Sequence, residues 1–178
     1  QFLLLDSNTG AMSAESGELL YPRSINKDGS LWTSNYKWWC SGFFPGSLWY
    51  VYEYTGNPEY KELALKYQKG LEPLRYRTDD HDIGFQLMCS YGNCLRITQD
   101  SLCVPVLIDG ANSLATRFDP EVGCTRSWDT KKYVFSVIID NMMNLELLTV
   151  ASSMTGDNSY YKKAKSHADR TMMNHFRP

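Results

Sequence analysis

The sequence lacks the features that would place it across a membrane or on a nucleic acid. No stretch approaches the roughly 20 apolar residues of a membrane-spanning helix. Lysine and arginine (18) nearly balance aspartate and glutamate (20), and a net charge of −2 gives no strong attraction to nucleic acid. Residues 1–6 also lack the basic region and long apolar run of a signal peptide, which leaves the compartment open. We therefore expect no nucleic-acid partner and no membrane span.

The sequence also lacks a metal-binding pattern. Its five cysteines are odd in number and include no CxxC pair, and the three histidines show no metal-ligand spacing with them. A zinc site and a dense disulfide framework are therefore not expected, and the cysteines are expected to be buried free thiols. We expect no metal ion and no cofactor.

What the sequence does contain is a repeated pair of helices. A length of 178 residues with 43% hydrophobic content predicts one domain, residues 1–178, with a substantial core. The apolar run 38–54 predicts a helix that begins near Pro45 and ends at the turn 55–58. Residues 58–71 then follow amphipathic helical spacing. Residues 6–30, rich in Ser, Gly, Asn and Asp, predict an irregular N-terminal segment with a short extended piece at 19–21.

The same pattern recurs 100 residues later. Thr155-Gly156 matches Thr55-Gly56, Tyr160 matches Tyr60 and Ala164 matches Ala64. A degenerate copy lies between, with a helix from about residue 85, a break at 98–100 and a helix over 102–118. Repeated helical pairs predict an all-α solenoid or closed α/α toroid, because one pair cannot bury its apolar face alone. We expect the first, more apolar helix of each pair to be the inner one.

Two aspartates stand in apolar surroundings, where an unpaired carboxylate is costly to bury. Asp82 precedes an apolar segment, and Asp140 interrupts the run 137–143. Trp39, Asp82 and Asp140 lie 16, 16 and 15 residues before Thr55, Thr98 and Thr155, so stacked repeats would bring all three to one rim. Aspartate is also a preferred N-cap, which remains the alternative reading. Asp80 is expected to be an exposed turn residue.

An insertion precedes the third repeat. Residues 119–129 carry turn signals and are expected to form a loop over the same rim. Trp128 and Arg126 could face a ligand there, and a role in surface packing is equally open.

Three segments resemble motifs of a known family. They are residues 38–49 (WWCSGFFPGSLW), 81–85 (HDIGF) and 139–144 (IDNMMN). In this order and with these gaps they resemble glycoside hydrolase family 88, the unsaturated glucuronyl hydrolases. The resemblance implies an (α/α)6 barrel that hydrates the C4=C5 bond of a 4,5-unsaturated uronic acid at the non-reducing end of an oligosaccharide. It implies that Asp140 is the general acid/base and Asp82 the second essential carboxylate, with Trp39, His81 and Trp128 lining the sugar subsite.

The residues around Asp140 are consistent with this chemistry. Apolar neighbours and a second carboxylate would raise the pKa of Asp140, as a proton donor requires, while Asp82 would stay ionised. The repeats occupy about half of a six-pair ring, so the remainder of the barrel is expected from sequence beyond residue 178. Three alternatives stay open: an unsaturated rhamnogalacturonyl hydrolase, an ordinary inverting glycosidase, and a non-catalytic helical-repeat module that binds carbohydrate.

Overall fold

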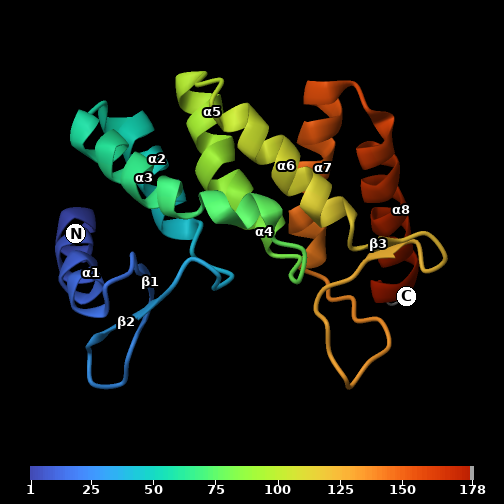
Figure 1. The fold of residues 1–178 in the computed structure, drawn as a ribbon, viewed down its shortest axis with the longest axis horizontal. Helices are drawn as coiled ribbons and strands as arrows, with labels where there is room; N and C mark the ends of the chain where they lie inside the picture. Colours follow the sequence, from blue (N-terminus) through green and yellow to red (C-terminus); the bar gives the residue numbers. More distant parts are fainter. Residues whose placement is uncertain (177–178) are drawn as a thin grey trace.

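A computed structural model describes residues 1–176, and helical pairs arranged side by side form most of it (Figure 1). The pairs are α2 (Phe43–Thr55) with α3 (Pro58–Gly70), α4–η2–α5 (Ile83–Leu87, Met88–Gly92 and Asn93–Thr98) with α6 (Cys103–Ala115), and α7 (Asn141–Thr155) with α8 (Asn158–His175). A 3-10 helix, η1 (Glu72–Tyr76), follows the first pair. The prediction of an all-α fold built from repeated helical pairs is confirmed.

The turns between the paired helices are closed by the same local hydrogen bonds. At the end of α2 the hydroxyl of Thr55 accepts a hydrogen bond from the Asn57 amide, and Gly56 adopts a left-handed φ of 68°. Asn57 then caps α3 by accepting from the Glu59 amide at 3.0 Å. Thr155, Gly156 and Asp157 repeat this arrangement between α7 and α8. Each side-chain cap contributes about 1 kcal/mol, so the repeat seen in the sequence has a direct structural cause.

The middle pair departs from the regular pattern at its first helix. This helix begins at Ile83, two residues earlier than expected, and contains a π-helical turn at Met88–Gly92. Close packing at its start requires Gly84, since a Cβ there would lie 2.6 Å from the backbone of Asn144 on α7. The first turns of α4 and α7 therefore pack with their backbones in direct contact.

The core lies between the pairs and draws on both helices of each. Trp49 of α2 is fully buried, and its indole N–H donates to Gln68 of α3 at 2.9 Å. The expected order, with the first helix of each pair as the inner one, does not describe how burial is distributed. Tyr50 and Tyr54 on α2 are exposed, whereas α6, the second helix of its pair, buries seven of its residues.

The N-terminal segment differs most from the prediction, which was an irregular stretch over residues 6–30. Residues Phe2–Ser16 form helix α1, and β1 (Tyr21–Ile25) pairs antiparallel with β2 (Leu31–Ser34). The helix is held by contacts with α3 that propensity does not describe: Asp6 accepts from Tyr67 at 2.8 Å and pairs with Lys66 at 2.9 Å. Tertiary contacts thus override the weak helix propensity of Ser, Thr and Gly.

The insertion before α7 forms a loop with one small ribbon. Strands β3 (Phe118–Asp119) and β4 (Cys124–Thr125) pair, and the chain then runs irregularly to residue 140. All five cysteines are free thiols, four of them buried and Cys89 half-buried. Within residues 1–176, no helix combines the length and apolarity needed to cross a membrane.

Candidate active site

The rim predicted from the repeat exists. The loops that lead into α2, α4 and α7 all lie along the lower edge of the helices in Figure 1, and the Thr-led turns lie along the upper edge. The charge of Asp140 acts on both His81 and Asp82, and the Trp39 ring lies 6.2 Å from that of Phe85 on α4. The structure therefore brings residues from three repeats to one site.

The N-cap reading of the two aspartates is not supported. Asp82 and Asp140 stand directly before α4 and α7, yet neither side chain caps its helix. Asn57 and Asp157 at the corresponding second helices do form such bonds. Helix capping therefore does not explain why aspartates stand at these two positions.

Asp82 is the carboxyl most strongly perturbed by its surroundings. Its exposed fraction is 6%, and burial raises the pKa of this carboxyl to about 7, with further upward contributions from the charges of Asp80 and Asp140. The Asp82 amide donates to Oδ1 of Asp80 at 3.1 Å, which fixes the turn. The direction of this shift favours the protonated carboxyl and runs against the expectation that Asp82 stays ionised.

His81 lies completely buried beside Asp82. Burial lowers the pKa of its imidazole, so the ring is neutral at pH 7. Nε2 of His81 lies 3.2 Å from Oδ1 of Asp82, and Nδ1 lies 3.3 Å from Nδ2 of Asn144. The ring also meets the indole of Trp128 edge-on at 5.7 Å.

Asp140 occupies a more open position than its sequence neighbours suggested. It is half-buried, and Ile139, Met142 and Met143 are exposed at the rim. Its Oδ1 is nevertheless buried and has no hydrogen-bond partner among residues 1–176. A buried carboxyl oxygen without a hydrogen-bond partner is uncommon in proteins, and here it marks Asp140 as a candidate functional residue.

Two half-exposed indoles lie at the same end of the helical pairs as the carboxyl groups. Trp39 is 46% exposed and packs edge-on against Phe43 and Phe85. Trp128 is 41% exposed, and its backbone forms an isolated antiparallel bridge with Asp80. Arg126, by contrast, stacks over Phe135 and pairs with Asp129, which favours its packing role. Exposed aromatic faces beside carboxyl groups suit the binding of sugar rings.

Two residues of the site escaped the sequence analysis. Asp80 is not an exposed turn residue: Arg77 binds it at 2.9 Å, and its side chain is only 14% exposed. Asn144 is fully buried and contacts both His81 and the start of α4. A polar residue in an otherwise apolar helical stretch was the available signal for Asn144, and only the fold reveals what it contacts.

Asp80, His81 and Asp82 each offer one ligand atom, and these atoms lie within 4.8 Å of one another. The guanidinium of Arg77 already binds the Asp80 carboxylate, so a positive charge stands where a cation would be needed. The donor set therefore fits an acid–base site better than a metal site.

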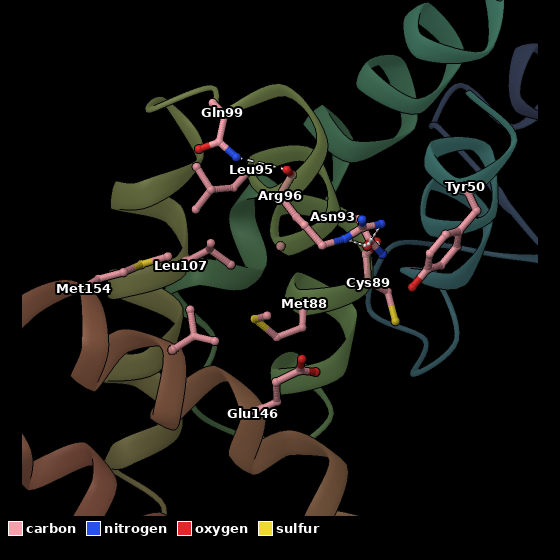
Figure 2. A pocket seen from close by; sticks show the side chains of 12 residues that line it. Tyr50, Met88, Cys89, Asn93, Leu95, Arg96, Gln99, Leu107, Glu146 and Met154 are labelled. Carbon is pink, nitrogen blue, oxygen red and sulfur yellow. Dashed lines mark hydrogen bonds between the residues drawn. The ribbon is translucent and has the colours of Figure 1, made fainter. Parts of the chain in front are cut away.

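A pocket of about 480 Å³ lies away from these residues, between α2, the helix α4–η2–α5 and α7 (Figure 2). Tyr50, Met88 and Glu146 are among its lining residues, and Arg96 at its edge is held by Glu53. None of the five expected site residues lines it. The rim, not this pocket, carries the candidate chemistry.

Helical pairs placed side by side, with carboxyl groups directly before their first helices, define part of an α/α-barrel. Searches against known proteins agree. The chain is 40% identical over 178 residues to an unsaturated glucuronyl hydrolase of Formosa agariphila, and 33% identical over 134 residues to an unsaturated chondroitin disaccharide hydrolase of Streptococcus pneumoniae. These matches cover 98% and 72% of this chain, and 43% and 34% of the relatives.

Solved structures agree with the sequence relatives. An unsaturated glucuronyl hydrolase specific for heparin superposes with a TM-score of 0.86 at 44% identity, over 89% of this chain and 43% of that one. No family model matches the chain. The chain belongs to the unsaturated glucuronyl hydrolase family, glycoside hydrolase family 88, and spans less than half the length of these relatives.

Proposed function

We propose that this chain carries the catalytic carboxyl groups of an enzyme that hydrates the C4=C5 bond of a 4,5-unsaturated uronic acid at the end of an oligosaccharide. The observation that carries the proposal is the pair Asp82 and Asp140 beside His81, at the same end of the helical pairs as the half-exposed Trp39 and Trp128. Family membership supports the same reaction. Net charge provides no argument for a nucleic-acid partner.

The reaction requires a proton donor that works near neutral pH. The C4=C5 bond is part of an enol ether, so a proton adds to C4 and positive charge develops on C5 and the ring oxygen. Water then adds to C5 and loses a proton to a base. The resulting hemiketal opens, and the rest of the oligosaccharide leaves from C1. A carboxyl with a pKa near 7 retains the proton that the first step consumes.

We propose that Asp82 and Asp140 together hold this proton. Two nearby carboxylates repel each other when both are ionised, so the pair keeps one proton to higher pH than an isolated carboxyl would. The group that faces C4 delivers it. The unpartnered Oδ1 and the resemblance to the family support Asp140 in that role, as acid and then as base towards water. Asp82, buried beside His81, is the second essential carboxyl.

The sugar would lie between the indoles. Trp39 and Trp128 are both about half exposed, and the imidazole of His81 meets the Trp128 ring edge-on at 5.7 Å. We propose that these three residues line the subsite of the unsaturated sugar. We further propose that residues 1–178 are part of one barrel domain, which additional helical pairs complete, because the relatives are more than twice as long.

The proposed reaction can be followed by loss of ultraviolet absorbance. The C4=C5 bond conjugated to the carboxylate absorbs, and hydration removes it. The full-length protein should bleach unsaturated disaccharides, and Asp140→Asn and Asp82→Asn should each lose more than about 100-fold in kcat. Asp169→Asn, the same substitution in an exposed ion pair with Lys165, should retain activity. An active Asp140→Asn enzyme would refute the assignment.

The source polysaccharide is a second question for the same assay. One relative is named for chondroitin disaccharides and one structure for heparin. We propose that the substrate is an unsaturated disaccharide derived from a glycosaminoglycan. Activity only on lyase products of rhamnogalacturonan would point to the pectin-directed alternative. Binding without loss of absorbance on any product would favour a non-catalytic module.

A further inference from the structure

The start of α7 is tied to the start of α4 by one fully buried side chain. Asn144 lies where α7 touches Gly84, close enough that any Cβ on residue 84 would overlap its backbone. Its Oδ1 accepts a hydrogen bond from the amide of Phe85 at 2.9 Å. Only the oxygen of the amide can accept this bond, so the orientation of the Asn144 side chain is determined.

This orientation decides the protonation state of the neighbouring imidazole. With Oδ1 occupied by Phe85, the Nδ2 group of Asn144 points at Nδ1 of His81, 3.3 Å away. An NH₂ group can only donate, so Nδ1 must accept and carries no proton. The neutral ring then carries its proton on Nε2, the atom that lies 3.2 Å from Oδ1 of Asp82.

We propose that Asn144 is a positioning residue that holds His81 in the Nε2–H tautomer, with the protonated nitrogen beside the carboxyl pair. Nε2 is buried and makes no hydrogen bond within residues 1–176, although Oδ1 of Asp82 lies 3.2 Å away and the Asn141 side chain also faces the ring. Its N–H is therefore available to stabilise the Asp82 carboxylate when the pair gives up its proton. The opposite tautomer would place a lone pair against that carboxylate. The effect on turnover rests on the proposed function, whereas the tautomer itself does not.

The tautomer can be read directly from imidazole ¹⁵N chemical shifts of the full-length protein labelled on histidine. In the wild type, Nδ1 of His81 should show an unprotonated shift and Nε2 a protonated one near pH 7.5. In Asn144→Asp the carboxylate still accepts from Phe85 but can no longer donate, so Nδ1 of His81 should gain a proton. His167 is the internal control: it is equally buried, and its Nδ1 accepts from the Thr125 amide at 2.9 Å, so its shifts should not change.

Activity supplies the second readout. Asn144→Asp should lower kcat by about 100-fold and change KM by less than about threefold, because the substitution acts on proton transfer and not on sugar contacts. Asn93→Asp is the matched control, since Asn93 is a partly buried asparagine on α5 that lies at the pocket of Figure 2 and away from the rim. It should retain full activity.

A proton on Nδ1 of His81 in the wild type would overturn the proposal even if no variant folds. Unchanged His81 shifts in a folded Asn144→Asp protein would overturn it as well, since Asn144 would then not set the tautomer. If the shifts change as expected but the wild type has no hydratase activity, the tautomer assignment stands and the proposed function fails.

Discussion

The buried Nε2 of His81 lies 3.2 Å from Oδ1 of Asp82, which joins a neutral imidazole to a carboxyl whose pKa is raised to about 7. This contact lies directly before α4, and Asp140 directly before α7 supplies the charge of a second carboxylate. Acid–base properties at the rim therefore depend on residues from two repeats.

Ionisation of Asp82 should make stability depend on pH. The folded-state pKa of about 7 lies above the unfolded value of about 3.9, so the folded protein binds this proton more tightly. Below about pH 4 Asp82 is protonated in both states and does not lower the free energy of unfolding. As pH rises from about 4 to about 7, the unfolded state ionises first, and the free energy of unfolding falls. Asp82→Asn should therefore raise Tm relative to wild type more at pH 8 than at pH 5. Thermal melts of the wild type and Asp82→Asn at pH 5 and pH 8 test this, and an equal difference in Tm at both pH values would contradict it.

Activity should decline on the alkaline side. If the carboxyl pair must hold a proton to act on C4, kcat/KM should fall as pH rises through about 7, following the Asp82 carboxyl. A pH–rate profile from pH 5 to 9 measures this limb. A rate that keeps rising to pH 9 would show that the proton comes from elsewhere.

The two rim tryptophans should affect binding more than folding. Trp39→Ala and Trp128→Ala should each raise KM by roughly 2- to 10-fold, the equivalent of about 0.5–1.5 kcal/mol of lost aromatic contact. Tm should change little because both side chains are nearly half exposed. Trp32→Ala on β2 is the matched control, since Trp32 is 45% exposed and stacks on Arg23 away from the carboxyl pair. Equal KM values for all three variants would argue against a sugar site between the indoles.

Gly84→Ala should separate the two helices that carry the carboxyl groups. The new Cβ would lie 2.6 Å from backbone atoms of Asn144, which cannot move without shifting α7. Overpacking of this kind costs about 1–3 kcal/mol, and activity should fall with it. Gly10→Ala provides the contrast: that Cβ meets nothing within 4 Å on α1, and a helical alanine should stabilise by about 0.5–1 kcal/mol. Denaturant unfolding of both variants measures the difference in sign.

The sequence alone determined the three helical pairs and the common position of Trp39, Asp82 and Asp140 before the first helix of each pair. The Thr-led turns and the caps at Asn57 and Asp157 are local devices, made from neighbouring residues, so they can be read directly from the chain. Equal spacing back from those turns then located Trp39, Asp82 and Asp140. How the helical pairs pack against one another could not be read from these local patterns.

Tertiary structure decided what local patterns cannot express. Asp6 of helix α1 accepts a hydrogen bond from Tyr67 on a distant helix, a contact that the propensities of its own segment do not indicate. The raised pKa belongs to Asp82 because burial and the charges of Asp80 and Asp140 act there together. The tautomer of His81 depends on Asn144, 63 residues away in the chain. Burial, charge proximity and hydrogen-bond direction are properties of three-dimensional neighbours, and for this site they exist only once α4 and α7 pack together.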